Sequence, residues 1–114
     1  MATRNRYYNI EGTIRSGFKL SRDYETLDFS FIKLNDDGVR ALVGSRSIKQ
    51  LKRLTINNNK LTQESGLAIA ESKWLENLQS LKLYRNKIGH EGLKALAESD
   101  KLPSLKSLRL AHNQ

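Results

Sequence analysis

The feature that most constrains the fold of this chain is a repeat of 27 residues. Similar residue types recur at this interval along most of the chain, and the apolar columns are the most numerous. Such a period indicates an array in which each repeat forms one structural unit, and neighbouring units bury each other's apolar faces. Three of the columns are Leu27, Leu54, Leu81 and Leu108; Phe29, Ile56, Leu83 and Leu110; and Asn59, Asn86 and Asn113.

Each repeat contains a strand pattern followed by a helix pattern. Residues 51–61, LKRLTINNNKL, alternate between apolar and polar side chains and then turn on consecutive asparagines. Residues 64–75 and 92–102 carry apolar side chains at helical intervals, which places Trp74 late in the second helix. We therefore expect strand, turn, helix and loop in every unit, with the strands parallel in one sheet. The units span residues 24–50, 51–77 and 78–104, and a partial unit spans 105–114.

The use of leucine agrees with such an array. The chain has 114 residues, of which 18 are Leu and only two are Val. Strands that are buried on both sides in ordinary α/β proteins draw heavily on Val and Ile. A stacked array instead repeats one γ-branched side chain in each column, so the excess of Leu follows from the repeat.

Three segments carry a resemblance to a known family. LKRLTINNNKL, LQSLKLYRNKI and LKSLRLAHN match the signature L-x-x-L-x-L-x-x-N-x-L, and GLKALA is similar to the helical half of the ribonuclease-inhibitor type. The chain thus resembles leucine-rich repeat proteins over residues 24–114. The resemblance implies an α/β fold, a short solenoid (right-handed αβ superhelix) with a parallel sheet on its concave face and helices on its convex face. The first unit departs from the signature, because Tyr24 replaces Leu and Ile32 replaces Asn.

Two polar columns have structural interpretations. An asparagine amide has two donors and an acceptor with two lone pairs, so an inward-facing Asn can satisfy backbone groups that leave a strand. We expect neighbouring repeats to share these bonds as a ladder. Acidic residues form the other column, at the expected first turn of each helix, where they stabilise the helix N-terminus. They are Asp37, Glu64 and Glu91.

Residues 1–23 lie outside the repeat. They carry five basic and two acidic residues, together with apolar side chains such as Ile14 and Phe18. We predict a capping segment that covers the first repeat, with Glu11 and Gly12 turning a small hairpin. The alternative is a basic arm that reaches a partner.

The fourth unit stops after Asn113 and Gln114, before any helix. This leaves an open strand edge and a half-covered leucine face. Two explanations compete: the chain is a piece of a longer array, or a second copy covers its end. We therefore expect self-association through the C-terminal edge, as a possible homodimer or larger homo-oligomer.

The charge of the chain predicts the chemistry of a partner. Lys and Arg total 20 against 12 Asp and Glu, and this net charge of +8 favours acidic partners. The repeat places Glu25 and Asp28 in the first row of the concave face and basic residues in the next three rows. An acidic protein surface is the expected ligand, because Arg and Tyr are common interface anchors. The predicted partner-binding residues are Lys52, Arg53, Lys82, Tyr84, Arg85, Arg109 and His112.

Two alternatives to a protein-interaction module stay open. One is nucleic-acid binding through the basic concave face and the N-terminal arm, although few aromatic side chains offer stacking surfaces there. The other is a fragment or scaffold that mainly self-associates.

A second basic column follows the strands at Lys33, Lys60 and Lys87. Neighbours about 5 Å apart in water repel by roughly 0.8 kcal/mol before salt screening, which flexible lysines tolerate. The column is either a solvated turn position or an anion-binding ridge.

Several classes are excluded or disfavoured. The chain has no Cys, so it has no disulfides and no thiolate site. It has no G-x-S-x-G, no phosphate loop and no paired His with metal spacing, so we expect no catalysis, no cofactor and no metal. No stretch approaches the ~20 apolar residues of a membrane span, and no apolar run suits a signal peptide, so we expect a cytoplasmic protein without membrane contact.

Overall fold

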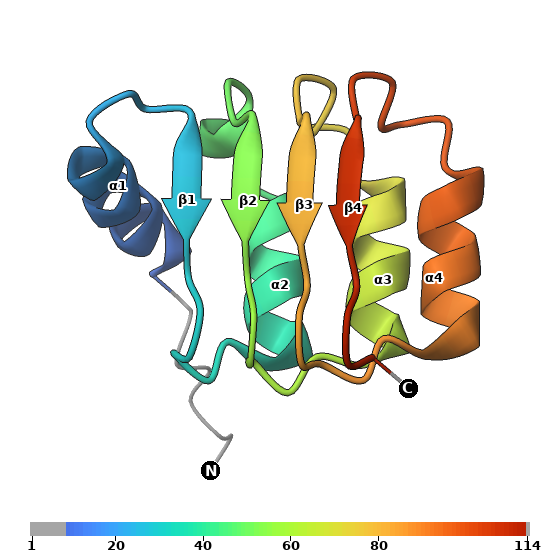
Figure 1. Ribbon diagram of the computed structural model, residues 1–114. Helices are drawn as coiled ribbons and strands as arrows, with labels where there is room; N and C mark the ends of the chain where they lie inside the picture. The colour runs from blue at the N-terminus through green and yellow to red at the C-terminus, as the bar shows by residue number, and fades with distance from the viewer. Residues whose placement is uncertain (1–8, 114) are drawn as a thin grey trace, which may run out of the picture.

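Four short parallel strands form one sheet, and helices cover one of its faces (Figure 1). The computed structural model describes residues 9–113. The strands lie in chain order, and three helices lie behind them, while a fourth helix, α1 (Ile10–Ser21), lies beside the first strand. The strands are β1 (Thr26–Asp28), β2 (Arg53–Thr55), β3 (Ser80–Lys82) and β4 (Ser107–Arg109), and the covering helices are α2 (Asn35–Val43), α3 (Gln63–Glu71) and α4 (Gly89–Glu98); a 3-10 helix, η1 (Arg46–Ile48), follows α2.

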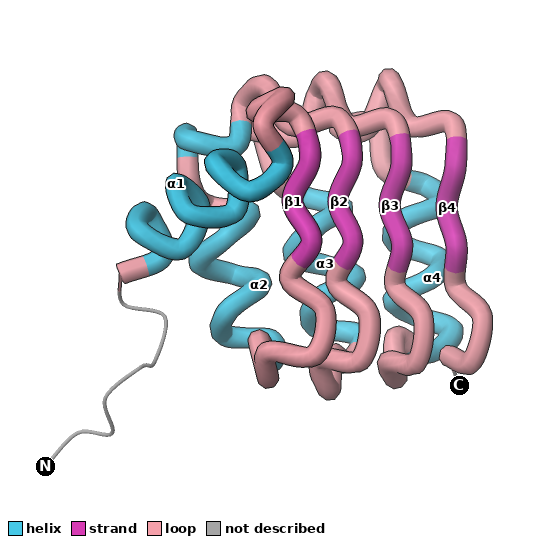
Figure 2. The backbone as a smooth tube through the Cα atoms, turned by 60° about the vertical axis from the view of Figure 1, so that its left-hand side comes forward, coloured by secondary structure: helices cyan, strands magenta, loops and turns pink. Residues whose placement is uncertain are grey.

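The predicted parallel sheet with helices behind it is confirmed, and its register equals the sequence repeat. Leu27 pairs with Leu54, Leu54 with Leu81, and Leu81 with Leu108. The first three of these leucines are fully buried, and Leu108 is half-buried. Because side chains alternate across a strand, a slip of one residue would move this leucine row to the other face. The tube view shows the turns at both ends of the strands lying in line from repeat to repeat (Figure 2).

The predicted asparagine ladder is present where the strands end. Asn59 Oδ1 accepts hydrogen bonds from the backbone N–H groups of Ile32, at 3.1 Å, and Leu34, at 2.9 Å. Its Nδ2 donates to the carbonyl of Phe29 at 2.7 Å. Asn59 is fully buried, and its own N–H donates to Asn86 Oδ1 at 2.9 Å. The same pattern recurs at Asn86 and Asn113, each of which accepts from the preceding repeat and donates back to it.

A serine column, which the sequence analysis missed, ends the helices. Ser72 Oγ donates to the Val43 carbonyl of the preceding repeat at 2.7 Å and accepts from the N–H of Trp74 at 3.2 Å. Ser99 makes the equivalent bonds to the Ala70 carbonyl and from the Lys101 N–H. Helices α3 and α4 therefore end at Glu71 and Glu98, earlier than predicted.

Trp74 consequently lies in the loop after α3 and not late in the helix, so that prediction was wrong. Ser72 has extended backbone with ψ 130° and closes the helix through its hydroxyl group, two residues before Trp74. Trp74 is half-buried. The centroid of its indole ring lies 5.6 Å from the Nζ of Lys73, which is a cation–π contact.

The predicted acidic column is confirmed, since Asp37, Glu64 and Glu91 lie in the first turns of α2, α3 and α4. The adjacent Asp36 has a different function. Its Oδ1 accepts from the N–H of Thr62 at 2.9 Å and its Oδ2 from the Thr62 hydroxyl at 2.7 Å, so Asp36 ties the start of α3 to that of α2.

Residues 10–21 form a helix, so the predicted hairpin at Glu11 and Gly12 was wrong. Ile10, Ile14 and Phe18 are spaced four residues apart, which puts all three on one helical face, and all three are buried in the core. That spacing predicts a helix, whereas the hairpin prediction was based on the Glu11-Gly12 dipeptide. The predicted arm includes residues 1–8, which lie outside the described residues.

Helix α1 joins the serine column at its first member. Glu11 accepts hydrogen bonds from the hydroxyl groups of Ser45 and Ser47. In later repeats the equivalent serine donates to a carbonyl of the preceding repeat, and here the carboxylate of Glu11 takes that place. These hydrogen bonds lower the pKa of Glu11, with the bond from Ser45 contributing most. The division of the chain into residues 1–23 and 24–114 stays a prediction.

We expect Asn59→Ala to lower the free energy of unfolding by about 3 kcal/mol or more, because it leaves several buried backbone groups without partners at roughly 1–3 kcal/mol each. The matched control is Asn77→Ala, since Asn77 is exposed and donates one bond, to the Lys49 carbonyl at 2.9 Å. This control should change stability by less than about 1 kcal/mol. Urea unfolding at equilibrium measures both, and equal losses would contradict the ladder's role.

Candidate partner-binding surface

The face of the sheet opposite helices α2, α3 and α4, here called the sheet face, is open (Figure 1). Its central row consists of register partners, one from each strand: Asp28, Thr55, Lys82 and Arg109. Asp28, Lys82 and Arg109 are exposed, and Thr55 is half-buried. The row therefore changes from acidic on β1 to basic on β3 and β4.

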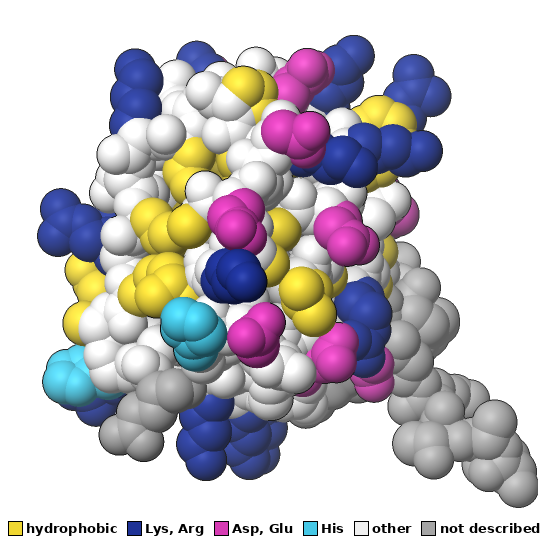
Figure 3. Space-filling view, turned by 90° about the vertical axis from the view of Figure 1, so that its right-hand side faces the viewer, with side chains coloured by type: hydrophobic (Ala, Val, Ile, Leu, Met, Phe, Trp, Pro, Cys, Tyr) yellow, Lys and Arg dark blue, Asp and Glu magenta, His cyan; other side chains and the backbone are white. Residues whose placement is uncertain are grey.

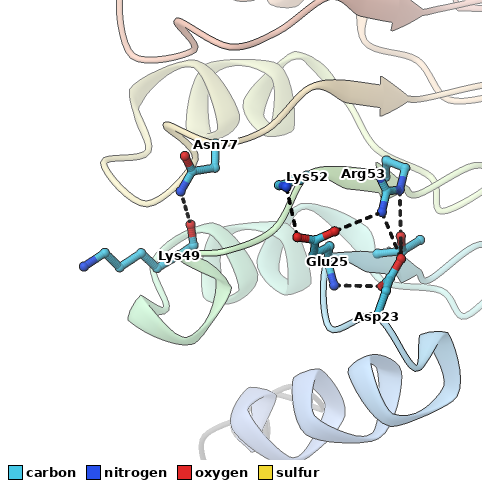
Figure 4. Close-up of polar contacts among 7 residues, drawn as sticks. Asp23, Glu25, Lys49, Lys52, Arg53 and Asn77 are labelled. Atoms are coloured by element: carbon cyan, nitrogen blue, oxygen red, sulfur yellow. Dashed lines mark hydrogen bonds and ion pairs between the residues drawn. The ribbon is translucent and has the colours of Figure 1, made fainter.

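The carboxylates of Asp23 and Glu25 neutralise the cations at the start of β2 (Figure 4). Arg53 Nη2 lies 2.9 Å from Asp23 Oδ2 and 3.5 Å from Glu25 Oε1, and its Nε donates to the Thr26 hydroxyl at 2.9 Å. Lys52 Nζ lies 3.0 Å from Glu25 Oε2. Two of the seven predicted binding residues, Lys52 and Arg53, thus already have carboxylate partners within the chain.

Asp23 is held in its charged form by this cluster. The backbone N–H of Glu25 donates to Asp23 Oδ1 at 2.8 Å, and Arg53 donates to the other oxygen. These contacts, the backbone bond foremost, lower the pKa of Asp23 from 3.8 to about 2. Asp23 lies before the first repeat, so the 27-residue spacing gave no signal that it would meet Arg53.

The cations on β3 and β4 have a different environment. Lys82 and Arg109 are direct register partners on adjacent strands, and both are exposed. Strands in a sheet lie about 4.8 Å apart, so neighbouring backbone positions carry two like charges, which repel each other. Within residues 9–113 no carboxylate forms an ion pair with either of them. An anion bound across β3 and β4 would relieve this repulsion.

The remaining predicted residues lie where the strands end. Tyr84 is half-buried, and its N–H donates to Asn57 Oδ1 at 2.7 Å. Arg85 and His112 are exposed and have positive φ angles of 57° and 63°, which belong to the turns after β3 and β4. The structure therefore separates the seven residues into three groups: the neutralised pair on β2, the basic pair on β3 and β4, and the turn residues.

The turns also carry cations that are not among the seven predicted binding residues. Arg85 lines an open cleft together with Lys33, Lys60 and Lys87, the lysine column that the repeat spacing had already singled out. Among residues 9–113 no group of three or more His, Asp or Glu could hold a metal ion. No described helix is long and apolar enough to cross a membrane.

Together the constant register, the asparagine ladder and the one-sided helical layer define a repeat solenoid. A family model described as Leucine Rich repeat matches residues 75–97, which include β3 and most of α4. This match and the constant register identify leucine-rich repeats in the chain. A search of curated proteins found no match. The ribonuclease-inhibitor type, which the helical half of each repeat resembles, stays a prediction.

We expect Asp23→Asn to reduce the acid sensitivity of the protein. The pKa of Asp23 is lower in the folded chain than in the unfolded chain, so its carboxylate stabilises the fold above about pH 4, and this contribution is lost as the pH falls toward 2. The free energy of unfolding should fall less steeply between pH 4 and pH 2 in the variant than in the wild type. Chemical unfolding at several pH values tests this, with Asp100→Asn at an exposed position as the control. Parallel pH profiles for wild type and Asp23→Asn would contradict the assignment.

Proposed function

We propose that this chain is a non-catalytic protein-interaction module whose sheet face binds an acidic protein surface over β3 and β4. Leucine-rich repeats suggest interaction with proteins, and the repeat fold supports that class of function. The single observation that carries the proposed site is the direct register pairing of Lys82 with Arg109. A cytoplasmic location stays a prediction, which rests on the absence from the sequence of a long apolar stretch of the kind that a signal peptide or membrane span contains.

Neighbouring residues support an anionic ligand at this position. Lys106 is exposed and lies next to Ser107, the first residue of β4, so it adds a third cation near the pair. Tyr84 lies just beyond β3 and is half-buried, and a partly ordered tyrosine costs little entropy when it becomes an interface anchor. The partner-binding set that we propose to test first is therefore Lys82, Arg109 and Tyr84, with Lys106 beside them.

The acidic side of the sheet face sets a direction for binding. Asp28 is exposed on β1, and Glu25 and Asp23 already hold Lys52 and Arg53. A negatively charged partner gains from β3 and β4 but is repelled near β1. We propose that the partner covers the C-terminal half of the sheet face and that Lys52 and Arg53 contribute less than the sequence predicted.

We expect Lys82→Glu with Arg109→Glu to weaken binding of an acidic peptide by about tenfold or more, since each exposed charge pair contributes roughly 0.5–1 kcal/mol and reversal adds repulsion. The probe is a labelled Glu-rich peptide, measured by fluorescence anisotropy. The control is Lys94→Glu with Lys101→Glu, which changes the net charge equally at exposed positions on α4 and in the loop after it. Equal losses in the two variants would reject the sheet face as the site.

A further variant, Tyr84→Ala, separates a protein ligand from nucleic acid. Single-stranded RNA binding would depend steeply on salt and would require aromatic stacking, for which Tyr84 is the candidate on this face. RNA binding that is tighter than peptide binding, and that Tyr84→Ala abolishes, would favour the nucleic-acid alternative. The partner itself can be sought by affinity purification with the wild type and both charge-reversal variants as baits.

Self-association is a second candidate function. It would use the end of the array formed by β4 and α4, here called the C-terminal face, where apolar side chains are exposed (Figure 3). Leu93 on α4 is 41% exposed, whereas Val39, two repeats earlier in the same column, is fully buried. Leu108 and Leu110 are half-buried, while Leu81 and Leu83 in the preceding repeat are fully buried. These differences leave a leucine surface that a second copy could cover.

If copies associate there, the wild type should have a mass above that of the monomer at tens of micromolar in light scattering, and Leu93→Glu should return it to the monomer. The matched control is Leu67→Glu, because Leu67 is 37% exposed but lies on α3. The introduced charge would be desolvated in the interface in the first case and solvated in the second. A clean wild-type monomer would remove this candidate.

A further inference from the structure

We propose that the turns after β1, β2 and β3 form a binding site for a compact polyphosphate anion, separate from the sheet face. The site is an open cleft of about 690 Å³ at the edge where the strands end, lined by cations from three successive repeats. Its size falls in the range of small-molecule pockets. Lys and Arg side chains lie at both the upper and the lower edge of the molecule in Figure 3, and the lower edge is the one at which the strands end in Figure 1.

The cleft is one-sided in charge. Lys33, Lys60, Arg85 and Lys87 line it, and no carboxylate among the described residues does. Lys60, Arg85 and Lys87 are exposed, and within residues 9–113 none of these three forms an ion pair. The proposal depends on these three residues, which together supply three charges within the width of two adjacent repeats.

Two other polar side chains of the cleft, Thr62 and Asn86, are already used inside the protein, and the Asn58 amide also lines it. The Thr62 hydroxyl donates to Asp36 Oδ2 at 2.7 Å and accepts from the Glu64 N–H at 3.2 Å. The Asn86 amide is part of the ladder. The cleft therefore offers ammonium and guanidinium groups to a ligand, and these select for anions.

Two of the three cations lie at turn positions with left-handed backbone. Lys60 and Arg85 have φ angles of 58° and 57°, in the left-handed region, which L-residues other than Gly, Asn and Asp adopt at a cost of roughly 1–2 kcal/mol. Asn58, with φ 54°, occupies the same column as Arg85 and shows that Asn fits this turn. Phe31 and His112 share this column with φ angles of 62° and 63°. The left-handed backbone therefore belongs to the turn itself, and Asn at Lys60 and Arg85 should relieve strain.

The spacing of the cations favours phosphate over carboxylate ligands. Columns in adjacent repeats lie about 4.8 Å apart, whereas side chains on the same side of an extended peptide lie about 6.6 Å apart. Linked phosphates share a bridging oxygen, so their charges lie closer together than those of an acidic peptide. A chain of three phosphates can therefore contact Lys60, Arg85 and Lys87 together.

The test is calorimetric titration with inorganic tripolyphosphate. The cleft variant combines Lys60→Asn, Arg85→Asn and Lys87→Gln, in which Asn relieves the left-handed backbone, so the variant should fold at least as stably as the wild type. We expect it to weaken binding at least about tenfold, the loss of three exposed charge contacts. The control variant combines Lys49→Gln, Lys94→Gln and Lys101→Gln, which removes the same net charge at exposed positions outside the cleft.

The outcomes are distinct. Weakening confined to the cleft variant, with Lys82→Glu and Arg109→Glu much less harmful, supports a separate polyphosphate site. Equal weakening in the cleft and control variants would show only a net-charge effect and would overturn the proposal. Sulfate that binds as tightly as tripolyphosphate would also overturn it, because the site would then not select linked phosphates.

A second arm identifies the source of the phosphates. Phe31 also lines the cleft, and its side chain is 74% exposed, so it could stack on a nucleotide base. If Phe31→Ala weakens ATP binding and leaves tripolyphosphate binding unchanged, the ligand is a nucleotide. If ATP and tripolyphosphate bind equally tightly, the ligand is a free polyphosphate. A short single-stranded RNA that binds more tightly than either, and that requires Lys82 and Arg109 as well, would replace the proposal with a nucleic-acid surface.

Discussion

The side-chain amide of the inward-facing asparagine is the interaction on which the rest of this structure depends. Asn59 and Asn86 each bond to backbone groups of the preceding repeat and to their own turn. A buried backbone group without a partner is costly, so each bond favours one alignment of neighbouring repeats. Once that alignment is set, each strand residue lies beside the residue 27 positions later. The positions of the exposed cations are therefore consequences of a few buried amides.

The first repeat has no preceding repeat to bond. Its turn side and its helical side compensate for this in different ways. Ile32 occupies the Asn position of the first repeat, and its backbone still donates to Asn59, so the ladder ends at this turn without an amide of its own. On the helical side, Ser45 has no earlier repeat carbonyl to bond, and Glu11 of α1 accepts its hydroxyl group instead. Burial of Ile14 and Phe18 holds α1 against the same repeat. Helix α1 thus covers the apolar face of the first repeat, and its Glu11 accepts the hydrogen bond that a carbonyl of a preceding repeat accepts elsewhere.

The sequence was sufficient to predict features that depend on equivalent positions in successive repeats. The register of Leu54 with Leu81, the ladder and the acids at helix starts all follow from the 27-residue spacing. The helix ends were not predicted, although Ser45, Ser72 and Ser99 recur at the same interval, because the spacing alone does not show that the hydroxyl group bonds a carbonyl in the preceding repeat. The ion pairs of Arg53 were also missed, since Asp23 lies outside the repeat. The helix at residues 10–21 was available from the spacing of Ile10, Ile14 and Phe18, and a turn dipeptide was given more weight.

Each repeat passes from an extended strand into a left-handed turn, so the single register of the repeats produces two basic surfaces, one on the strands and one on the turns. Lys82 and Arg109 lie within strands, where adjacent repeats place them in register on the open face of the sheet. Arg85 and Lys60 lie in the turns, where left-handed backbone angles separate them from the strand positions. Both sets repeat at the spacing of the strands, so each forms a row of positive charge across neighbouring repeats. Because a strand and its turn belong to the same repeat, the asparagine that fixes one row fixes the other, and a substitution in either row leaves the ladder intact. The two proposed anion sites therefore depend on the same buried amides, although their residues lie in different parts of each repeat.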